Sequence, residues 1–492
     1  MVTIAKNFIN GAWIKSCGTD MLEIINPATR ELLGKTPMGT AQDVDAAVNA
    51  AQNAFPAWKS TPAPDRIQYL FLLKAKLEEH FEDLAQMITR EHGKTLAESR
   101  GSVRRGIQMV ETACGIPSLL MGDNFENIAR DIDCSTVNRP MGVFSCIAPF
   151  NFPAMVPFWF WPFAIACGNT YILKPSERVP LTSIRIFELL QDIKMPPGVI
   201  NMVQGGREVV NSICAHPEIK GISFVGSTPV AKHIYETGSA TGKRVQALGG
   251  AKNVMVAMPD SINEGMKKRS IATAVESITG CAGERCLAGS LVLCVSQAVY
   301  EAFAQGTVEI AAKIQVGDGL NPETNMGPLI SQAAKDRVIT LIERAVVQGA
   351  KVLLDGRKDL DEHEGYFLKP TVLSEVTIDM EIAQEEVFGP VVLLAKADSL
   401  DHAIDWINSI PYANTTTLFT ASGANARKFS SQVDPSMIGI NIGVPAPMAF
   451  FSFGGSKDSF FGDIKAHGKA AIGFFTDTYT TIYRWYNESG IW

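Results

Sequence analysis

The sequence predicts a soluble α/β protein with more than one domain, and three observations support this. The chain has 492 residues, too long for a single hydrophobic core, so two or three domains are expected. Its composition, with 46% hydrophobic and 19% charged residues, is typical of globular proteins. From Pro140 onward, short apolar runs that end in turn residues alternate with helical stretches. This alternation indicates parallel sheets with helices on both faces.

The N-terminal elements follow from local signals. "FINGAWI" holds the Asn-Gly dipeptide of a tight hairpin between apolar flanks. Thr40, with Asp43 three residues later, predicts a helix N-terminus, and apolar residues then recur at helical spacing. A second helix is predicted from about residue 64 to 92, ended by Gly93.

The rest of the chain alternates between strands and helices. Predicted strands are "GVFSCIAP", "NTYILKPS", "GVINMVQG" and "GISFVGS", with "LTSIRIFELLQDI" and "REVVNSICAH" as helices between them. A second alternation begins near "NVMVAM" and runs past "GPVVLLAKA". The tail "TYTTIYRWY" alternates β-branched and aromatic residues without an obvious partner in its own domain. We therefore expect it to be an edge strand that is added to another subunit.

Composition also excludes several classes of function. The net charge of −7 argues against nucleic acid as the main partner. The nine cysteines and seven histidines are dispersed, so we expect no disulfide framework and no metal site. The start "MVTIAKNFINGAW" lacks an export signal, and free thiols fit a reducing compartment, which predicts a cytoplasmic protein. Residues 141–173 carry no charge, but repeated prolines favour a buried strand-loop-helix-strand segment over a membrane span.

Two stretches are candidates for a dinucleotide site, although no GxGxxG follows a predicted strand. In "SFVGSTPVAKHIY", small hydroxyl residues and Pro229 follow a strand, which fits either an anion site or an ordinary capped helix. In "ILKPSER", Lys174 and Glu177 follow another strand, and Glu177 could accept hydrogen bonds from ribose hydroxyls. A glutamate there favours NAD over NADP, but Arg178 could offset its repulsion of a 2′-phosphate.

"TGCAGERCLAGS" raises the question of whether Cys286 is a nucleophile or a core thiol. Small residues allow another molecule to approach the backbone, and the neighbouring Arg285 favours a thiolate. From these residues alone both interpretations stay open.

The motifs "FNFP", "LKPSE", "FVGST", "LGGAKN", "GERC" and "EEVFGP" occur in an order that resembles the aldehyde dehydrogenase superfamily over nearly the whole chain. Longer strings such as "IAPFNFPAMVPFW" and "GINIGVPAPMAFF" resemble its coenzyme A-acylating, methylmalonate-semialdehyde branch. The resemblance implies a Rossmann-like NAD-binding domain, an α/β catalytic domain and a β oligomerisation arm in a homo-oligomer, a dimer of dimers. The implied segments are 1–119 with 140–247, 248–446, and 120–139 with 447–492.

The resemblance also implies roles for individual residues. Cys286 would be the nucleophile and Asn151 the donor to the oxyanion, as thiohemiacetal chemistry requires. Arg105 and Arg285 would hold a substrate carboxylate, although Arg105 could instead be a surface helix arginine beside Arg104. The implied cofactor-binding residues are Ala148, Phe150, Lys174, Glu177, Arg178, Ser227, Gly249 and Glu386.

Ala247 favours one reaction outcome. Hydrolytic relatives usually place a glutamate just before Leu-Gly-Gly as the base that activates water, whereas this chain has "VQALGGAKN". Without that base, coenzyme A would accept the acyl group, so malonate or methylmalonate semialdehyde would give acetyl- or propionyl-coenzyme A and carbon dioxide. The alternatives are a hydrolytic dehydrogenase, with Glu284 as a substitute base, or a nucleotide-binding protein without catalysis. Departures at Gly249, Val254 and Ser456 leave room for a related semialdehyde.

Overall fold

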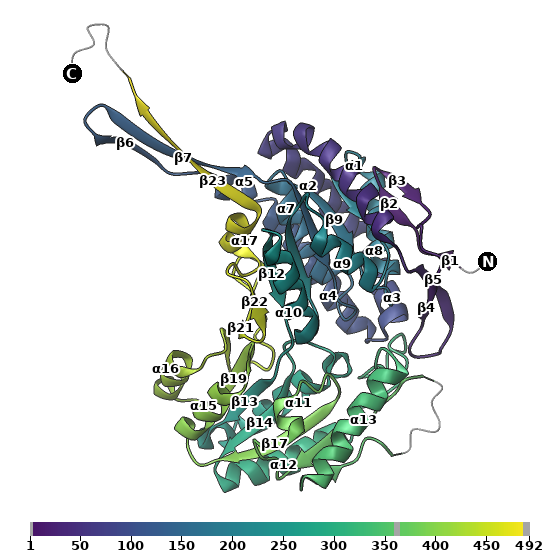
Figure 1. Ribbon diagram of the computed structural model, residues 1–492. Helices are drawn as coiled ribbons and strands as arrows, with labels where there is room; N and C mark the ends of the chain where they lie inside the picture. Colours follow the sequence, from purple (N-terminus) through teal and green to yellow (C-terminus); the bar gives the residue numbers. More distant parts are fainter. Residues whose placement is uncertain (1–2, 359–364, 486–492) are drawn as a thin grey trace.

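The computed structural model describes residues 3–358 and 365–485. Figure 1 shows two bodies, each built around a sheet, and a thin β arm that projects from the upper body. The long apolar runs of the sequence form the central strands of the two sheets, which are buried on both faces.

The first sheet has eight strands in the order β22-β12-β11-β8-β9-β10-β2-β3. Its central strands are parallel, and antiparallel strands lie at both edges. Their bounds are β2 Asn7–Ile9, β3 Ala12–Ile14, β8 Val143–Ile147, β9 Thr170–Lys174, β10 Ile200–Met202, β11 Ile219–Val225, β12 Arg244–Leu248 and β22 Phe460–Phe461.

Helices cover both faces of this sheet (Figure 1). They are α1 Ala41–Ser60, α2 Ala63–Glu79, α3 Phe81–His92, α4 Leu96–Ala113, α5 Ile116–Leu119, α6 Met155–Phe158, α7 Trp161–Ala166, α8 Leu181–Asp192, α9 Arg207–Ala215 and α10 Thr228–Ala240. A small sheet of β1 Thr3–Ile4, β4 Met21–Ile25 and β5 Leu32–Pro37 lies beside them.

The second sheet has seven strands in the order β15-β16-β17-β14-β13-β19-β20, all parallel except β15. The strands are β13 Asn253–Ala257, β14 Gly289–Val295, β15 Lys351–Leu354, β16 Thr371–Ser374, β17 Val391–Ala397, β19 Thr415–Phe419 and β20 Met437–Ile440. The helices are α11 Lys267–Thr279, α12 Gln297–Ala311, α13 Gln332–Val347, α14 Glu381–Gln384, α15 Leu400–Ser409 and α16 Gly423–Gln432. A two-stranded ladder joins β18 Tyr412–Ala413 to β21 Ser456–Lys457.

The arm is a three-stranded antiparallel sheet in the order β23-β7-β6. Its strands are β6 Asn124–Ala129, β7 Ile132–Pro140 and β23 Thr476–Arg484, and α17 Gly468–Phe475 leads into the last of them. The tail therefore has a partner within its own chain, β7, which the sequence pattern did not reveal. The pairing joins residues more than 300 positions apart, and no local signal encodes such a contact.

Most predicted elements are confirmed, with one correction. The hairpin of β2 and β3 turns at Asn10 and Gly11, and α1 begins after Thr40. The single helix predicted for residues 64–92 is wrong: α2 ends at Glu79 and α3 begins at Phe81, because His80 leaves the helical region with φ −102° and ψ 22°. Acidic residues in the first turn of α3 favour that second start.

The uncharged segment 141–173 forms β8, α6, α7 and β9, as predicted. Among the described residues, no helix combines the length and apolar character needed to cross a bilayer. The domain boundaries remain predictions; β22, which lies inside the segment 447–492 assigned to the arm, pairs with β12 of the first sheet.

Candidate active site

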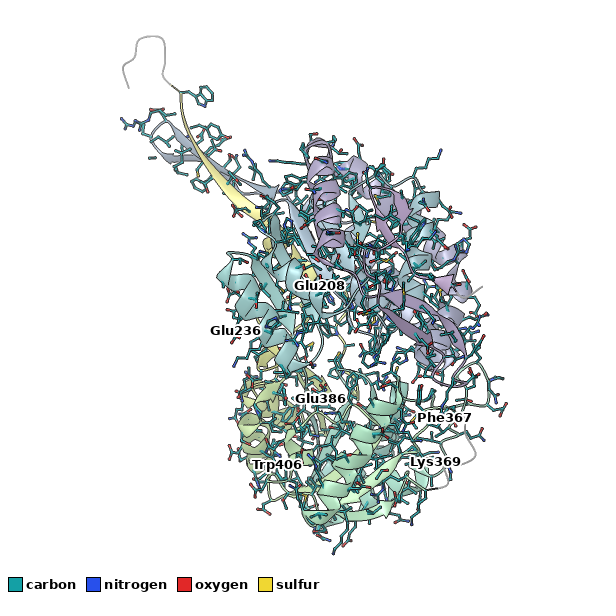
Figure 2. All side chains as sticks on the ribbon, turned by 45° about the vertical axis from the view of Figure 1, so that its right-hand side comes forward. Glu208, Glu236, Phe367, Lys369, Glu386 and Trp406 are labelled. Atoms are coloured by element: carbon teal, nitrogen blue, oxygen red, sulfur yellow. The ribbon has the colours of Figure 1, made fainter. Side chains whose placement is uncertain are left out.

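A cavity of about 860 Å³ lies at the carboxyl ends of the parallel strands β8, β9 and β11. Parallel α/β sheets bind ligands at this edge. Its wall is completed by the loops that carry Cys286 and Glu386, which belong to the second body. Figure 2 shows Glu386 at the boundary between the two bodies. The cavity thus joins the carboxyl edge of a parallel sheet, where nucleotides commonly bind, to the thiol of Cys286.

The loop that carries Cys286 is held in an unusual backbone conformation. It begins with a 3₁₀ turn, Gly280–Gly283, in which Cys281, Ala282 and Gly283 have φ values of 50°, 53° and 78°. Positive φ is costly for residues other than glycine and is found mainly where the surroundings enforce it. Asn253 and Asn414 enforce the end of the loop: both side-chain amides donate to the Cys286 carbonyl, at 2.8 and 2.9 Å.

Cys286 is a protonated thiol in the ligand-free protein. Burial raises its pKa to about 12, and the negative charge of Glu386 contributes in the same direction. Arg285 opposes this effect only weakly. The sequence suggested that Arg285 favours a thiolate, so the larger influence of burial corrects that expectation.

Asn151 is anchored at both its side chain and its main chain. Its Nδ2 donates to the Glu284 carbonyl at 2.9 Å, two residues before Cys286. Its own carbonyl accepts from the ammonium of Lys94 at 2.5 Å. The amide and the thiol therefore lie on adjoining loops that line the same cavity.

Most of the cofactor candidates lie together. Seven of them line the cavity: Ala148, Phe150, Lys174, Glu177, Ser227, Gly249 and Glu386. Arg178 does not; its side chain is exposed to solvent. Ser227 is the N-cap of α10, which starts at Thr228 and has Pro229 in its first turn. The first amides of a helix have no partner within the helix, so the end of α10 that lines the cavity is chemically suited to an anion.

Lys174 and Glu177 form an ion pair, with 2.6 Å between Nζ and Oε2. Burial alone would raise the pKa of Glu177, but the adjacent Lys174 outweighs it and holds the pKa below its usual value. Glu177 is therefore ionised at neutral pH and can accept hydrogen bonds.

Glu386 is the second carboxylate of the cavity. Burial raises its pKa to about 7, so it is partly protonated at neutral pH. Arg337 holds its backbone by donating to the carbonyls of Glu386 and Val387 at 2.5 and 2.8 Å. A Cβ atom at Gly250 would lie only 2.8 Å from Oε2, so this glycine makes room for the carboxylate.

The sequence was also compared with models of known protein families. The model of the aldehyde dehydrogenase family matches residues 13–481. The chain belongs to the aldehyde dehydrogenase family.

Two relatives are named malonate-semialdehyde dehydrogenase. The Geobacillus kaustophilus protein is 46% identical over 475 residues, 96% of each chain. The Shouchella clausii protein is 44% identical over 490 residues, 99% of each chain. Among solved structures, methylmalonate-semialdehyde dehydrogenase from Oceanimonas doudoroffii has a TM-score of 0.96 at 40% identity. A provisionally named one from Sinorhizobium meliloti, complexed with NAD, has a TM-score of 0.96 at 36%, and both cover 99% of each chain.

In this aldehyde dehydrogenase the two substrate-site candidates lie outside the cavity lining. Arg105 contacts Met448 Sδ at 2.8 Å and the Ala446 carbonyl at 3.4 Å. Arg285 donates to the carbonyls of Glu276 and Ser277 at the end of α11, at 2.7 and 3.1 Å. Each guanidinium group thus donates to protein atoms, while the buried Arg285 Nε has no hydrogen-bond partner among the described residues.

The substitute base considered for a hydrolytic enzyme also lies elsewhere. The Glu284 carboxyl is buried behind the cavity, where Oε1 accepts from the Ile330 amide at 3.2 Å and Oε2 lies 3.8 Å from His92 Nε2. Burial raises its pKa to about 8, so it is neutral at pH 7. Ala247 lies buried in β12 and offers no titratable group.

Sequence reasoning missed several residues of this site. Asn253 belongs to the quoted "LGGAKN" motif, but its contact with the Cys286 carbonyl depends on the fold. Asn414 and Lys94 lie far from any quoted motif. The sequence places Lys94 directly after the helix-ending Gly93, but its burial, which marks it as unusual, depends on the fold.

Proposed function

We propose that the chain oxidises malonate semialdehyde or methylmalonate semialdehyde, with NAD⁺ as oxidant and coenzyme A as acyl acceptor. For the smaller substrate, aldehyde, thiol and NAD⁺ give acetyl-coenzyme A, carbon dioxide and NADH. The thiol proton replaces the lost carboxylate, and the aldehyde hydrogen leaves as hydride, so atoms and charge balance. The names of the relatives support the substrate class.

The observation that carries the proposal is the placement of Cys286 and Asn151 in one cavity wall. Attack by sulfur on an aldehyde carbon places negative charge on the former carbonyl oxygen. The Asn151 amide and the Cys286 main-chain N–H are proposed to stabilise that charge. Loss of hydride then leaves a thioester on Cys286.

The residues around the cavity fit a dinucleotide. The N-terminus of α10 suits a phosphate, Glu177 suits ribose hydroxyls, and Glu386 is proposed to bind the ribose nearer the thiol. NAD⁺, when bound, supplies the hydride acceptor. The NAD complex of the Sinorhizobium meliloti neighbour supports this cofactor.

The acyl acceptor is inferred from what the cavity lacks. Glu177 and Glu386 are the carboxylates among its described lining residues, and the position of the usual water-activating glutamate is Ala247. Because both carboxylates are assigned to ribose binding in this proposal, water has little assistance in attacking the thioester, whereas a thiol is already a good nucleophile near neutral pH. Coenzyme A fits this chemistry.

The test is NADH formation from malonate semialdehyde with and without coenzyme A, with the product identified by mass spectrometry. We expect fast turnover and acetyl-coenzyme A only when coenzyme A is present. Cys286→Ala should abolish turnover, while Cys281→Ala, a matched buried thiol five residues away, should retain it. Equal turnover without coenzyme A, giving free acid, would favour a hydrolytic enzyme.

Arg105 and Arg285 remain the proposed partners of the substrate carboxylate. Each would have to exchange a protein contact for the substrate, because both are engaged in the ligand-free protein. A panel of aldehydes with and without a carboxylate, assayed with Arg105→Leu and Arg285→Leu, tests this role. Both variants should lose their preference for carboxylated aldehydes.

A further inference from the structure

Lys94 is a fully buried cation next to Asn151. It lies between α3 and α4, and only 1% of its surface is exposed. Its ammonium donates to the Asn151 carbonyl at 2.5 Å and lies 3.9 Å from the centroid of the Phe152 ring. Burying an ammonium is costly, so its contacts must be strong for the arrangement to persist.

The main chain at Lys94 is fixed by close packing against the second body. Gly93 has φ 96°, and a Cβ there would lie 2.7 Å from Pro328 Cγ. A Cβ at Gly319 would lie 2.4 Å from the Lys94 carbonyl oxygen. The Leu96 amide donates to the Gly319 carbonyl at 2.9 Å. These contacts fix the position of the Lys94 backbone, from which the long side chain extends.

The same short segment also reaches the loop of the nucleophile. Glu98, in the first turn of α4, accepts a hydrogen bond from the Cys281 amide at 2.6 Å. It also caps α4 through Thr95. Lys94 and Glu98 thus contact the two loops that carry Asn151 and Cys286, one each.

We propose that Lys94 is a positioning residue, which sets the orientation of Asn151 relative to Cys286 through the Asn151 carbonyl. This inference rests on the proposed role of Asn151 in stabilising the oxyanion. Lys94 fixes the peptide of Asn151, and the Glu284 carbonyl fixes its side chain, so the amide has little freedom. A displacement of about 1 Å in such a group costs about a hundredfold in rate.

A double-mutant cycle between Lys94 and Asn151 tests this. Lys94→Met, which keeps the chain length and removes the ammonium, should lower kcat by about tenfold to a hundredfold. The KM for NAD⁺ and the rate of Cys286 alkylation should stay unchanged. In the Asn151→Ala background the same substitution should have no further effect on kcat, because its effect passes through Asn151. An equal loss in both backgrounds would overturn the proposal.

Arg66→Met is the matched control. Arg66 is another buried cation that donates to main-chain carbonyls, those of Ala166 and Thr61, away from the cavity. The Arg66→Met variant should have a lower melting temperature and an unchanged kcat. A Lys94→Met variant with the same two properties would refute a positioning role. If Lys94→Met does not fold, Lys94→Ala, which also removes the donor to the Asn151 carbonyl, takes its place in the cycle.

The two proposals fail in different ways. If the wild-type enzyme forms no NADH from the semialdehyde, the proposed function is wrong. If the wild-type enzyme forms NADH and Asn151→Ala is fully active, the proposed reaction is retained. The oxyanion role of Asn151 and the positioning role of Lys94 are then both wrong.

Discussion

Cys286 and Glu386 are coupled at the level of single residues. Burial and the carboxylate both raise the pKa of the thiol, to about 12, while the carboxyl itself titrates at about 7. Cys286 therefore reacts slowly with electrophiles at neutral pH, because only a small fraction of it is thiolate. Activation requires a change in this environment, which the positively charged nicotinamide ring of the proposed NAD⁺ would supply.

This coupling predicts a pH-dependent alkylation of Cys286 by iodoacetamide in the absence of cofactor. The rate should rise about tenfold per pH unit, because the thiolate fraction does so below the pKa. Glu386→Gln should accelerate alkylation above pH 7, where the native carboxylate is charged, and have little effect below it, where the carboxyl is protonated. Peptide mass spectrometry at residue 286 gives the rates, and a rate independent of pH would contradict the assignment.

The location of individual site residues could be predicted where they belong to a recognisable motif, but the direction of their side chains could not. Cys286 and Asn151 were chosen from motifs, and the fold brings them to one cavity. The direction of Arg285 could not be predicted, because it depends on carbonyls at the end of α11 and on Gly280, where a Cβ would lie 1.9 Å from the guanidinium. A side chain next to the nucleophile in sequence can still point away from it.

At the scale of elements, the turn before Cys286 depends on the absence of a side chain at Gly283. Its φ is 78°, and a Cβ there would lie 2.2 Å from the Gly389 carbonyl oxygen. This contact joins the loop of the nucleophile to the loop that follows Glu386. One close backbone approach therefore fixes the loops of Cys286 and Glu386 relative to each other.

Gly283→Ala should lower the free energy of unfolding by about 1–3 kcal/mol through backbone strain, and should reduce kcat. Gly101→Ala is the control, because Gly101 is exposed within α4 and its Cβ would meet nothing within 4 Å. That variant should raise stability by about 0.5–1 kcal/mol with unchanged kcat. Urea unfolding and steady-state assays measure both, and a neutral Gly283→Ala would show that the loop adapts.

Strands and helices with a local signal were predicted well. The hairpin, the capped start of α1 and the alternating elements after Pro140 agree with the structure. The break at His80 was missed because apolar periodicity continues across it, and the pairing of β23 was missed because strand partners at long range have no local signature.

At the scale of the whole molecule, the arm exposes an apolar row. Phe125, Cys134 and Ile482 face one another across β6, β7 and β23, and both Phe125 and Ile482 are 66% exposed. A thin sheet with an uncovered apolar row is unusual for a monomer. We therefore propose that a second copy of the chain covers it, as expected for a homo-oligomer.

Ile482→Asp should reduce the molar mass in solution, because it places a charge in the proposed interface. Thr481→Asp, on the opposite face of the same strand, should leave the mass unchanged. Size-exclusion chromatography with light scattering gives the masses. A monomeric wild-type protein, or an unchanged mass for Ile482→Asp, would reject the proposal.

Within the cavity, Lys174 competes with any other hydrogen-bond donor for the Glu177 carboxylate. A ribose whose hydroxyl groups donate to Glu177 would share this carboxylate with Lys174, so that binding would weaken the ion pair. Added salt also weakens this ion pair and thereby reduces the competition. The affinity for the proposed dinucleotide would then vary with ionic strength through Glu177, although the ribose hydroxyls that Glu177 would contact are uncharged.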